Sequence, residues 1–165
     1  MIGAVVMDLD GTLIDSTRLQ PVAGAEALVR VIADHVPVVV ATTAPARYAA
    51  MLTDLLPELF DPVSSIVVGD PADTPANLLE TVLESLGMAP RNVVALLNSA
   101  TALTSARALG MRPMALPDPH RPLARQADMP FAPTPHHAAV DLLRMFRTEG
   151  AIPVRWKLIR ELLPV

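Results

Sequence analysis

The chain has 165 residues, of which 52% are hydrophobic and 3% aromatic, with a formal net charge of −4 and no cysteine. This length suits one domain with an adequate core. The lack of cysteine excludes disulfides, cysteine–zinc sites and thiol chemistry. No run approaches the ~18 uncharged apolar residues of a membrane helix, and the first residues lack the charged region of a signal peptide. We therefore expect a cytoplasmic protein that does not contact a membrane.

The charge is distributed unevenly along the chain. Residues 1–111 carry a formal charge of −7, and residues 112–165 carry +3. The acidic part favours a bound metal ion over nucleic acid. The basic part has too few cations and aromatic residues to predict a nucleic-acid surface, so we do not expect a nucleic-acid partner.

Taken in chain order, apolar strand-like runs alternate with amphipathic segments. The valine-rich run that ends at Asp8 predicts a buried strand, followed by a polar connection over residues 15–21. Further strands are predicted at 36–41, 65–68, 92–97 and 112–116, and helices at 22–34, 45–57, 75–86 (capped by Thr74), 101–109 and 136–146. Such alternation predicts an α/β fold with a central parallel sheet, flanked by helices through right-handed crossovers.

Two segments depart from this alternation. Six prolines fall within residues 117–135, a density that predicts a loop with at most a short edge strand at 129–132. Residues 1–146 then form the predicted core domain, and residues 147–165 a C-terminal extension with an amphipathic helix over 153–163. That helix either packs on its own domain or docks on a partner, in which case it mediates a homo-oligomer.

The predicted functional centre is the run that begins at Val5 and ends at Ser16. Asp8 and Asp10 follow the buried strand directly, at the edge where open α/β sheets bind ligands. In a continuing strand the two carboxylates would share one face. They are candidates for a nucleophile or metal ligand beside an acid/base, although their spacing does not identify the reaction.

The string D-L-D-G-T-L-I-D-S resembles the first motif, DxDGTxxD, of the haloacid dehalogenase (HAD)-like hydrolases, most of which are phosphatases. The resemblance covers residues 1–146 and implies a three-layer Rossmann-like fold. It implies that Asp8 is the nucleophile that forms an aspartyl-phosphate and that Asp10 is the acid/base. It also implies phosphate binding by the backbone of Leu9, Gly11 and Thr12, and a magnesium ion held by Asp8, Asp10 and the residue at position 98.

The second motif of this family, a hydroxyl residue after the second strand, is similar to V-V-V-A-T-T, with Thr42 in the usual place and Thr43 beside it. Both threonines are therefore predicted to bind the phosphoryl group, although threonine also commonly ends strands and caps helices. Arg47 follows on the next helix and is a candidate phosphate-binding cation. Arg18 is a second candidate.

The third and fourth motifs depart from the family pattern. Asp73 stands where the family has a lysine, and Asn98 where it has an aspartate. Asn98 offers only a neutral carbonyl oxygen, so we expect Mg²⁺ to bind weakly. The missing lysine removes a positive charge beside Asp8. Two interpretations stay open: a weakly active phosphatase, or a catalytically degenerate domain that binds a protein partner or a phosphorylated ligand.

The spacing of the motifs leaves no room for the inserted cap domain of many relatives. The chain thus resembles a capless member with an open site, which suits a bulky phosphorylated substrate or a partner that covers the site. Other polar residues have simpler explanations. Asp70 and Asp73 are predicted to stabilise a loop and a helix start, and His120, His136 and His137 to be surface or capping residues.

Overall fold

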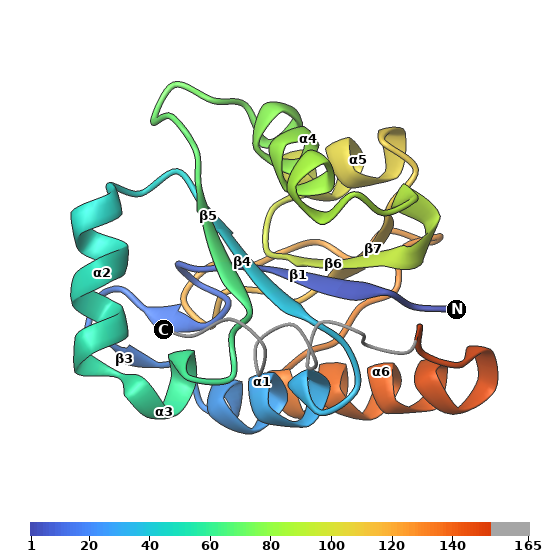
Figure 1. Cartoon of the computed structure of the whole chain (residues 1–165), viewed down its shortest axis with the longest axis horizontal. Coiled ribbons are helices and arrows are strands. Elements are labelled where there is room, and N and C mark those ends of the chain that lie inside the picture. The colour runs from blue at the N-terminus through green and yellow to red at the C-terminus, as the bar shows by residue number, and fades with distance from the viewer. Residues whose placement is uncertain (153–165) are drawn as a thin grey trace, which may run out of the picture.

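The computed structural model describes residues 1–152, and these form one α/β domain (Figure 1). The strands of the main sheet are β1 (Ala4–Asp8), β4 (Val38–Thr42), β5 (Ser65–Val68), β6 (Val93–Leu97) and β7 (Arg112–Ala115). The helices are α1 (Ala25–Ala33), α2 (Ala46–Leu55), α3 (Pro57–Phe60), α4 (Pro75–Leu86), α5 (Ala100–Ala108) and α6 (Pro135–Glu149). Within these residues no second domain is inserted, which is compatible with the predicted capless architecture.

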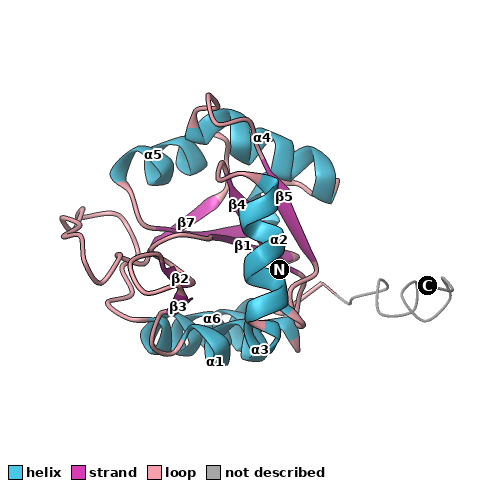
Figure 2. Ribbon diagram, turned by 90° about the vertical axis from the view of Figure 1, so that its left-hand side faces the viewer, coloured by secondary structure: helices cyan, strands magenta, loops and turns pink. Residues whose placement is uncertain are grey.

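The five strands are parallel and lie in the order β5-β4-β1-β6-β7, so β1 occupies the middle of the sheet. Helices α1, α3 and α6 cover one face, and α4 and α5 cover the other, which gives three layers (Figure 2). The predicted Rossmann-like architecture is thus confirmed. Because β1 has a neighbour on each side, its carboxyl end opens onto the middle of one sheet edge, where Asp8 lies.

The sequence alternation of each central strand accounts for the two halves of the core. Val5 and Met7 of β1 pack toward α1 and α6, whereas Val6 between them packs toward α4 and α5. Strands β4 and β6 repeat this pattern, and all their residues are buried. A strand buried on both faces reads as a continuous apolar run, which is why these strands were recognisable in the sequence.

Helix and strand limits follow local signals where these are strong. Strand β5 and helix α4 have the predicted limits, and the Thr74 side chain caps α4 by accepting a hydrogen bond from the Asn77 N–H at 3.2 Å. Helix α1 begins later than predicted, at Ala25, because Gly24 adopts a left-handed conformation with φ of 88°. That conformation is not helical, and it separates the helix from the preceding chain.

The connection after β1, predicted only as a polar segment, contains a hairpin that was not predicted. Residues 14–21 form a small antiparallel hairpin of β2 (Ile14–Asp15) and β3 (Gln20–Pro21). Its turn is held by Asp15, which accepts hydrogen bonds from the N–H and the hydroxyl of Thr17 at 3.0 and 2.6 Å. The strands are two residues long, too short to show the alternation by which a hairpin is predicted.

The proline-rich segment 117–135 is a loop, as predicted, and it is attached to the sheet. Phe131 forms a parallel bridge with Ala115, and the Ala115 N–H donates to the Pro130 carbonyl oxygen at 2.8 Å. The Arg107 guanidinium donates to the Asp128 carbonyl oxygen, also at 2.8 Å. The predicted edge strand at 129–132 is therefore reduced to a single bridge, because the surrounding prolines lack the N–H groups that a longer ladder needs.

Helix α6 extends three residues beyond its predicted end and crosses the predicted domain boundary at residue 146. Ala151 then forms a bridge with Ile2. The amphipathic helix predicted over 153–163, with its packing or dimerisation role, lies outside the described residues. None of the helices within residues 1–152 combines the length and the apolar character needed to span a membrane.

An ion pair fastens the end of α6 to the sheet edge. The Arg112 guanidinium donates to both carboxylate oxygens of Glu149, at 2.6 and 2.7 Å. This hydrogen bond from Arg112 is the main cause that lowers the pKa of the Glu149 carboxyl below its ordinary value. The pair therefore stabilises the fold above the ordinary pKa of Glu, and its contribution is lost as the pH falls through the lowered value.

We expect Glu149→Gln to lower the free energy of unfolding at pH 7 by about 0.5–1 kcal/mol, since the pair is bidentate but partly exposed. Urea denaturation at pH 7 and pH 3 measures this, and the difference between the proteins should shrink at pH 3. Asp141→Asn is the control, because Asp141 faces Arg144 at 3.6 Å in an exposed pair and should change little. Equal losses from both substitutions would contradict the expectation.

Candidate active site

Asp8 ends β1 at the carboxyl edge of the sheet, between the ends of β4 and β6. Its Oδ2 accepts a hydrogen bond from the Asn98 main-chain N–H at 3.1 Å. Burial raises the pKa of the Asp8 carboxyl to about 7; the Asn98 hydrogen bond opposes this, and the nearby Asp10 adds to it. A perturbed carboxyl at a sheet edge is typical of a functional group.

Asp10 does not continue the strand, because β1 ends at Asp8 and the chain turns at the buried residue Leu9. The prediction that Asp8 and Asp10 share one strand face was therefore wrong in its geometry. Both side chains nevertheless line the same hollow, of about 410 Å³. Asp10 is the more exposed of the two, so it can exchange protons with water while Asp8 is partly buried.

Tyr48, on α2, was not identified from the sequence. Its hydroxyl donates to Asp10 Oδ1 at 3.0 Å. Burial is the main cause that raises the Tyr48 pKa to about 12, with the Asp10 hydrogen bond adding to it, so the phenol keeps its proton and stays a donor. Because the two residues are 38 positions apart, no local pattern predicts their contact. The contact orients the carboxylate that is the candidate acid/base.

Asn98 follows β6 and contacts the turn after β1 through its side chain. The side-chain N–H₂ group donates to the Asp10 carbonyl oxygen at 2.7 Å and to the Thr12 hydroxyl oxygen at 3.2 Å. A carbonyl oxygen only accepts hydrogen bonds, which fixes this orientation of the amide. The Asp10 carbonyl, predicted to be a metal ligand, is thus already bonded to a donor.

Gly11 lets the turn pack closely against two neighbours. Its φ is +80°, and a Cβ at this position would lie 2.7 Å from Asp118 Oδ2 and 2.8 Å from Asn98 Nδ2. Any other residue would be strained there and would also displace both side chains. Asp118 comes from the proline-rich loop and was not singled out in the sequence, because its approach depends on the path of that loop.

Of the predicted phosphate-binding residues, three line the hollow with Asp8: Leu9, Thr42 and Thr43. The Thr42 Oγ1 accepts a hydrogen bond from the Ala44 N–H at 3.0 Å. A hydroxyl that accepts one hydrogen bond keeps its proton available to donate. Thr42 is therefore placed to bind a phosphoryl oxygen while it also shapes the turn into α2.

The other three predicted phosphate-binding residues are placed less favourably. The Gly11 N–H donates to the Ile14 carbonyl oxygen at 2.8 Å, so it is already used within the turn. Thr12 is 1% exposed, and its hydroxyl faces Asn98. Arg47 is exposed on α2 and is not among the residues that line the hollow. The first turn of α2 presents Tyr48 to the site instead.

Asp73, at the position assigned to the family lysine, is among the residues that line the hollow. Its Oδ2 accepts a hydrogen bond from the Asp70 N–H at 2.8 Å, and Asp70 Oδ1 accepts one from the Ala72 N–H. Both aspartates therefore stabilise their loop, as predicted. Asp73 still contributes a negative charge to the wall where the resemblance implies a positive one.

The hollow is consequently acidic. Asp8, Asp10 and Asp73 line it, and none of its lining residues is a lysine, arginine or histidine. A phosphate dianion placed beside three carboxylates needs a compensating cation. Arg121, from the proline-rich loop, lines the adjoining hollow with Asp10 and Asn98, and it was not predicted from the sequence.

The donor set of the hollow fits a weakly held magnesium ion. Asp8 offers a carboxylate, Asp10 a main-chain carbonyl, and Asn98 an amide oxygen once its side chain turns over. Mg²⁺ accepts such hard oxygen ligands and keeps several waters. Within residues 1–152, however, no three His, Asp or Glu side chains gather as a metal-binding group. The Asn98 N–H₂ group also competes for the Asp10 oxygen, so the set favours low affinity.

Comparison with solved structures identifies the fold. A HAD phosphatase from Thermococcus onnurineus superposes with a TM-score of 0.72 at 15% identity, over 86% of this chain and 98% of that one. CbbY from Rhodobacter sphaeroides, in complex with phosphate, gives 0.66 at 16% identity, over 86% and 100%. YfnB from Bacillus subtilis, bound to magnesium, gives 0.74 at 10% identity, over 86% and 98%.

No protein-family model matches the sequence, and no curated protein matches it either. These three structures share only 10–16% sequence identity with this chain, so their likeness to it shows the fold alone. The similar solved structures are those of HAD-like proteins. This chain has the HAD-like fold, and Asp8 and Asp10 line one hollow at the carboxyl edge of its sheet.

Proposed function

We propose that this protein is a HAD-type phosphatase of low intrinsic activity that hydrolyses a phosphoric monoester through an aspartyl-phosphate. The observation that carries the proposal is the shared hollow of Asp8, Asp10 and Thr42 at the carboxyl edge of β1 and β4. A domain that merely folds needs no pair of carboxylates there. The structurally similar proteins include a HAD phosphatase and a putative HAD-hydrolase, which supports the same reaction class.

In the proposed reaction the Asp8 carboxylate attacks phosphorus, and the bond from phosphorus to the leaving oxygen breaks. Asp10 gives its proton to that oxygen. In the second step Asp10 takes a proton from a water molecule that attacks the aspartyl-phosphate, which regenerates Asp8 and releases inorganic phosphate. Thr42 donates to a phosphoryl oxygen, and Tyr48 holds Asp10 in place.

Mg²⁺ is part of the proposal, held by Asp8, the Asp10 carbonyl and Asn98. When bound, it would neutralise charge on the carboxylates and on the phosphoryl oxygens. The acidic lining of the hollow supports this role, since no cationic side chain among the lining residues can replace it. A cytoplasmic location, where free magnesium is available, agrees with the absence of cysteine.

The test is hydrolysis of phenyl phosphate by the full chain with and without Mg²⁺, beside Asp8→Asn. Turnover that needs both Asp8 and Mg²⁺ supports the proposal. Turnover that persists in Asp8→Asn would belong to a contaminant or to another site, and the proposed mechanism would have to be abandoned.

A second candidate function is a binding module for a phosphorylated ligand or a protein partner that covers the open site. Two observations favour it: Asp73 in the place of a cation, and the Asn98 amide bonded to the Asp10 carbonyl. In this case phenyl phosphate would bind without turnover. The C-terminal extension, proposed above as a partner-binding or homo-oligomer element, would be the first segment to truncate in a search for a protein partner.

Tyr48→Phe should lower kcat for phenyl phosphate about fivefold, since a hydrogen bond to an exposed carboxylate contributes roughly 1 kcal/mol. KM should change little, because Tyr48 contacts Asp10 and is not among the residues that line the phosphate hollow. Arg47→Gln is the matched control, one residue away on the same helix. We expect it to leave both constants unchanged. A raised KM in Arg47→Gln would restore the phosphate-binding role predicted from the sequence.

A further inference from the structure

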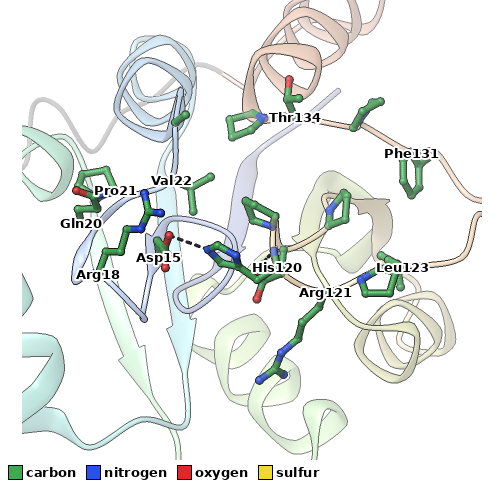
Figure 3. A pocket seen from close by; sticks show the side chains of 17 residues that line it. Asp15, Arg18, Gln20, Pro21, Val22, His120, Arg121, Leu123, Phe131 and Thr134 are labelled. Atoms are coloured by element: carbon green, nitrogen blue, oxygen red, sulfur yellow. Dashed lines mark hydrogen bonds and ion pairs between the residues drawn. The ribbon is translucent and has the colours of Figure 1, made fainter.

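A separate groove of about 930 Å³ lies beside the site (Figure 3). One wall is the hairpin that follows β1, and the other is the proline-rich loop 117–135. The lining is mostly apolar, from Val22, Leu123, Phe131 and six prolines. Its volume is within the range of small-molecule sites.

The groove is continuous with the catalytic hollow. An intermediate hollow of about 460 Å³ shares Asp10, Asn98 and Ser99 with the catalytic hollow. At its other side it shares Asp118, Arg121, Pro122 and Leu123 with the groove. A molecule whose phosphoryl group lies at Asp8 can therefore extend past Asp10 and Arg121 into the groove. Asp10, the proposed proton donor to the leaving group, lies on this path.

Hydrogen bonds of His120 fix the positions of the groove walls. His120 Nε2 on the loop lies 2.8 Å from Asp15 Oδ2 on the hairpin, and Figure 3 shows this contact across the groove floor. The His120 N–H also donates to Asp118 Oδ1 at 2.8 Å. Such fixed walls bind a ligand without first having to become ordered.

The charges of the groove favour an anionic ligand. Asp15 is paired with His120, and Asp118 accepts the His120 N–H. Arg18 and Arg121 also line the groove. Among the described residues, neither arginine forms a hydrogen bond or ion pair with another side chain, so their charges are available to a ligand. Arg121 lines both the groove and the intermediate hollow, whereas Arg18 lines only the groove.

We infer that this groove binds the leaving group of the substrate, and that the substrate is a small phosphoric monoester with an apolar, ring-sized body and a second anionic group. The phosphoryl group would lie at Asp8, the body between Val22 and Phe131, and the second anion at Arg18. This inference rests on the proposed function for the position of the phosphoryl group. It adds the substrate class, which the catalytic hollow alone does not define.

The test is ligand binding to Asp8→Asn in the full chain with Mg²⁺, so that no turnover interferes. The probes are phenyl phosphate, 2-naphthyl phosphate, 6-carboxy-2-naphthyl phosphate and 2-naphthol, measured by calorimetry. We expect the naphthyl ester to bind about tenfold more tightly than the phenyl ester and the carboxylated ester to bind more tightly again. Without its phosphate, 2-naphthol should bind far more weakly than its ester.

Three variants locate the effect within the groove. Phe131→Ala should remove the preference for naphthyl over phenyl, and Arg18→Gln should remove the gain from the carboxylate. Arg18 is exposed, so this second variant does not depend on tolerance of a core change. Arg125→Gln is the matched control, since Arg125 is an exposed arginine that contacts Phe131 but does not line the groove. It should retain both preferences.

Equal affinity for phenyl and naphthyl phosphate, or preferences that survive in both groove variants, would overturn the inference. Its failure is distinguishable from that of the proposed function. If wild type hydrolyses all esters with the same kcat/KM, the phosphatase stands and the groove assignment falls. If the esters bind with the expected preferences but wild type never hydrolyses them, the groove assignment stands and the proposed catalysis falls.

Discussion

Asp8→Asn should lower phosphatase turnover by at least about 10³-fold. It should also raise the free energy of unfolding of the metal-free protein at pH 8. The first effect follows from loss of the nucleophile. The second follows from burial, which raises the pKa of the Asp8 carboxyl from an ordinary 3.8 to about 7. The charged form is therefore disfavoured in the folded state, and an amide of the same shape removes that penalty.

The stability difference between Asp8→Asn and wild type depends on pH, because the Asp8 pKa differs between the folded and the unfolded state. Below pH 3.8 the Asp8 carboxyl is protonated in both the folded and the unfolded state, so its ionisation does not change the free energy of unfolding. Between pH 4 and 7 the unfolded state loses this proton while the folded state keeps it, which lowers the stability of wild type. Above about pH 7 the penalty is constant. Asp8→Asn should therefore gain stability over wild type across pH 4–7 and keep that gain above pH 7.

The gain in the free energy of unfolding should be about 2 kcal/mol at pH 8. This is less than the full pKa shift implies, because Asp8 is partly exposed. Urea denaturation at pH 4 and pH 8 with a chelator present measures it. Asp10→Asn is the control: Asp10 is exposed, so the corresponding change in stability should be small. Added Mg²⁺ should narrow the gap at pH 8, since a bound cation stabilises only the protein that keeps the Asp8 charge. A variant no more stable than wild type at pH 8 would refute the explanation.

The double substitution Asp73→Lys with Asn98→Asp should raise kcat/KM for phenyl phosphate about 100-fold. It restores a cation in the lining of the hollow and a carboxylate where Mg²⁺ is expected. Interactions of charged groups with a transferring phosphoryl group are commonly the largest contributions to catalysis. A kcat/KM equal to that of wild type, in a folded protein, would contradict the placement of both residues in the site.

The single substitutions separate the two causes. Asn98→Asp should lower stability without metal, because a carboxylate would then face the Asp10 carbonyl oxygen that Asn98 now bonds at 2.7 Å. It should also make the melting temperature rise steeply with added Mg²⁺, unlike Asn98→Ala. Asp73→Lys loses the hydrogen bond from the Asp70 N–H. Asp73→Asn is its control, since it removes the charge but keeps an acceptor, and it should give only a severalfold gain.

The central strands and most helices could be predicted because their signals are local. Val38–Thr42 and Val93–Leu97 are buried on both faces and read as apolar runs. Thr74 and Pro75 mark the start of α4 by capping and ring geometry. By contrast, the hairpin at 14–21 was missed because each of its strands has only two residues.

The candidate site was predictable where a contiguous motif carries it. Asp8, Asp10 and Thr42 come together at the sheet edge because parallel strands end there, and this follows from the topology. Tyr48, Asp118 and Arg121 were missed, since their positions depend on a helix rotation and a loop path that no short pattern encodes. Arg47 was predicted to bind phosphate because of its charge and its position soon after Thr42, but α2 places its neighbour Tyr48 at the site instead.

The hydrogen bond from position 98 to Asp8 has an evolutionary consequence. The donor is the main-chain N–H, which every residue except proline provides. The side chain at 98 can therefore change without disturbing the contact that holds Asp8 at the end of β1. Lineages of this fold are free to gain or lose a metal ligand there by a single substitution while the sheet stays intact. The structural cost of such a change is confined to the side-chain hydrogen bonds from Asn98 to the Asp10 carbonyl oxygen and the Thr12 hydroxyl.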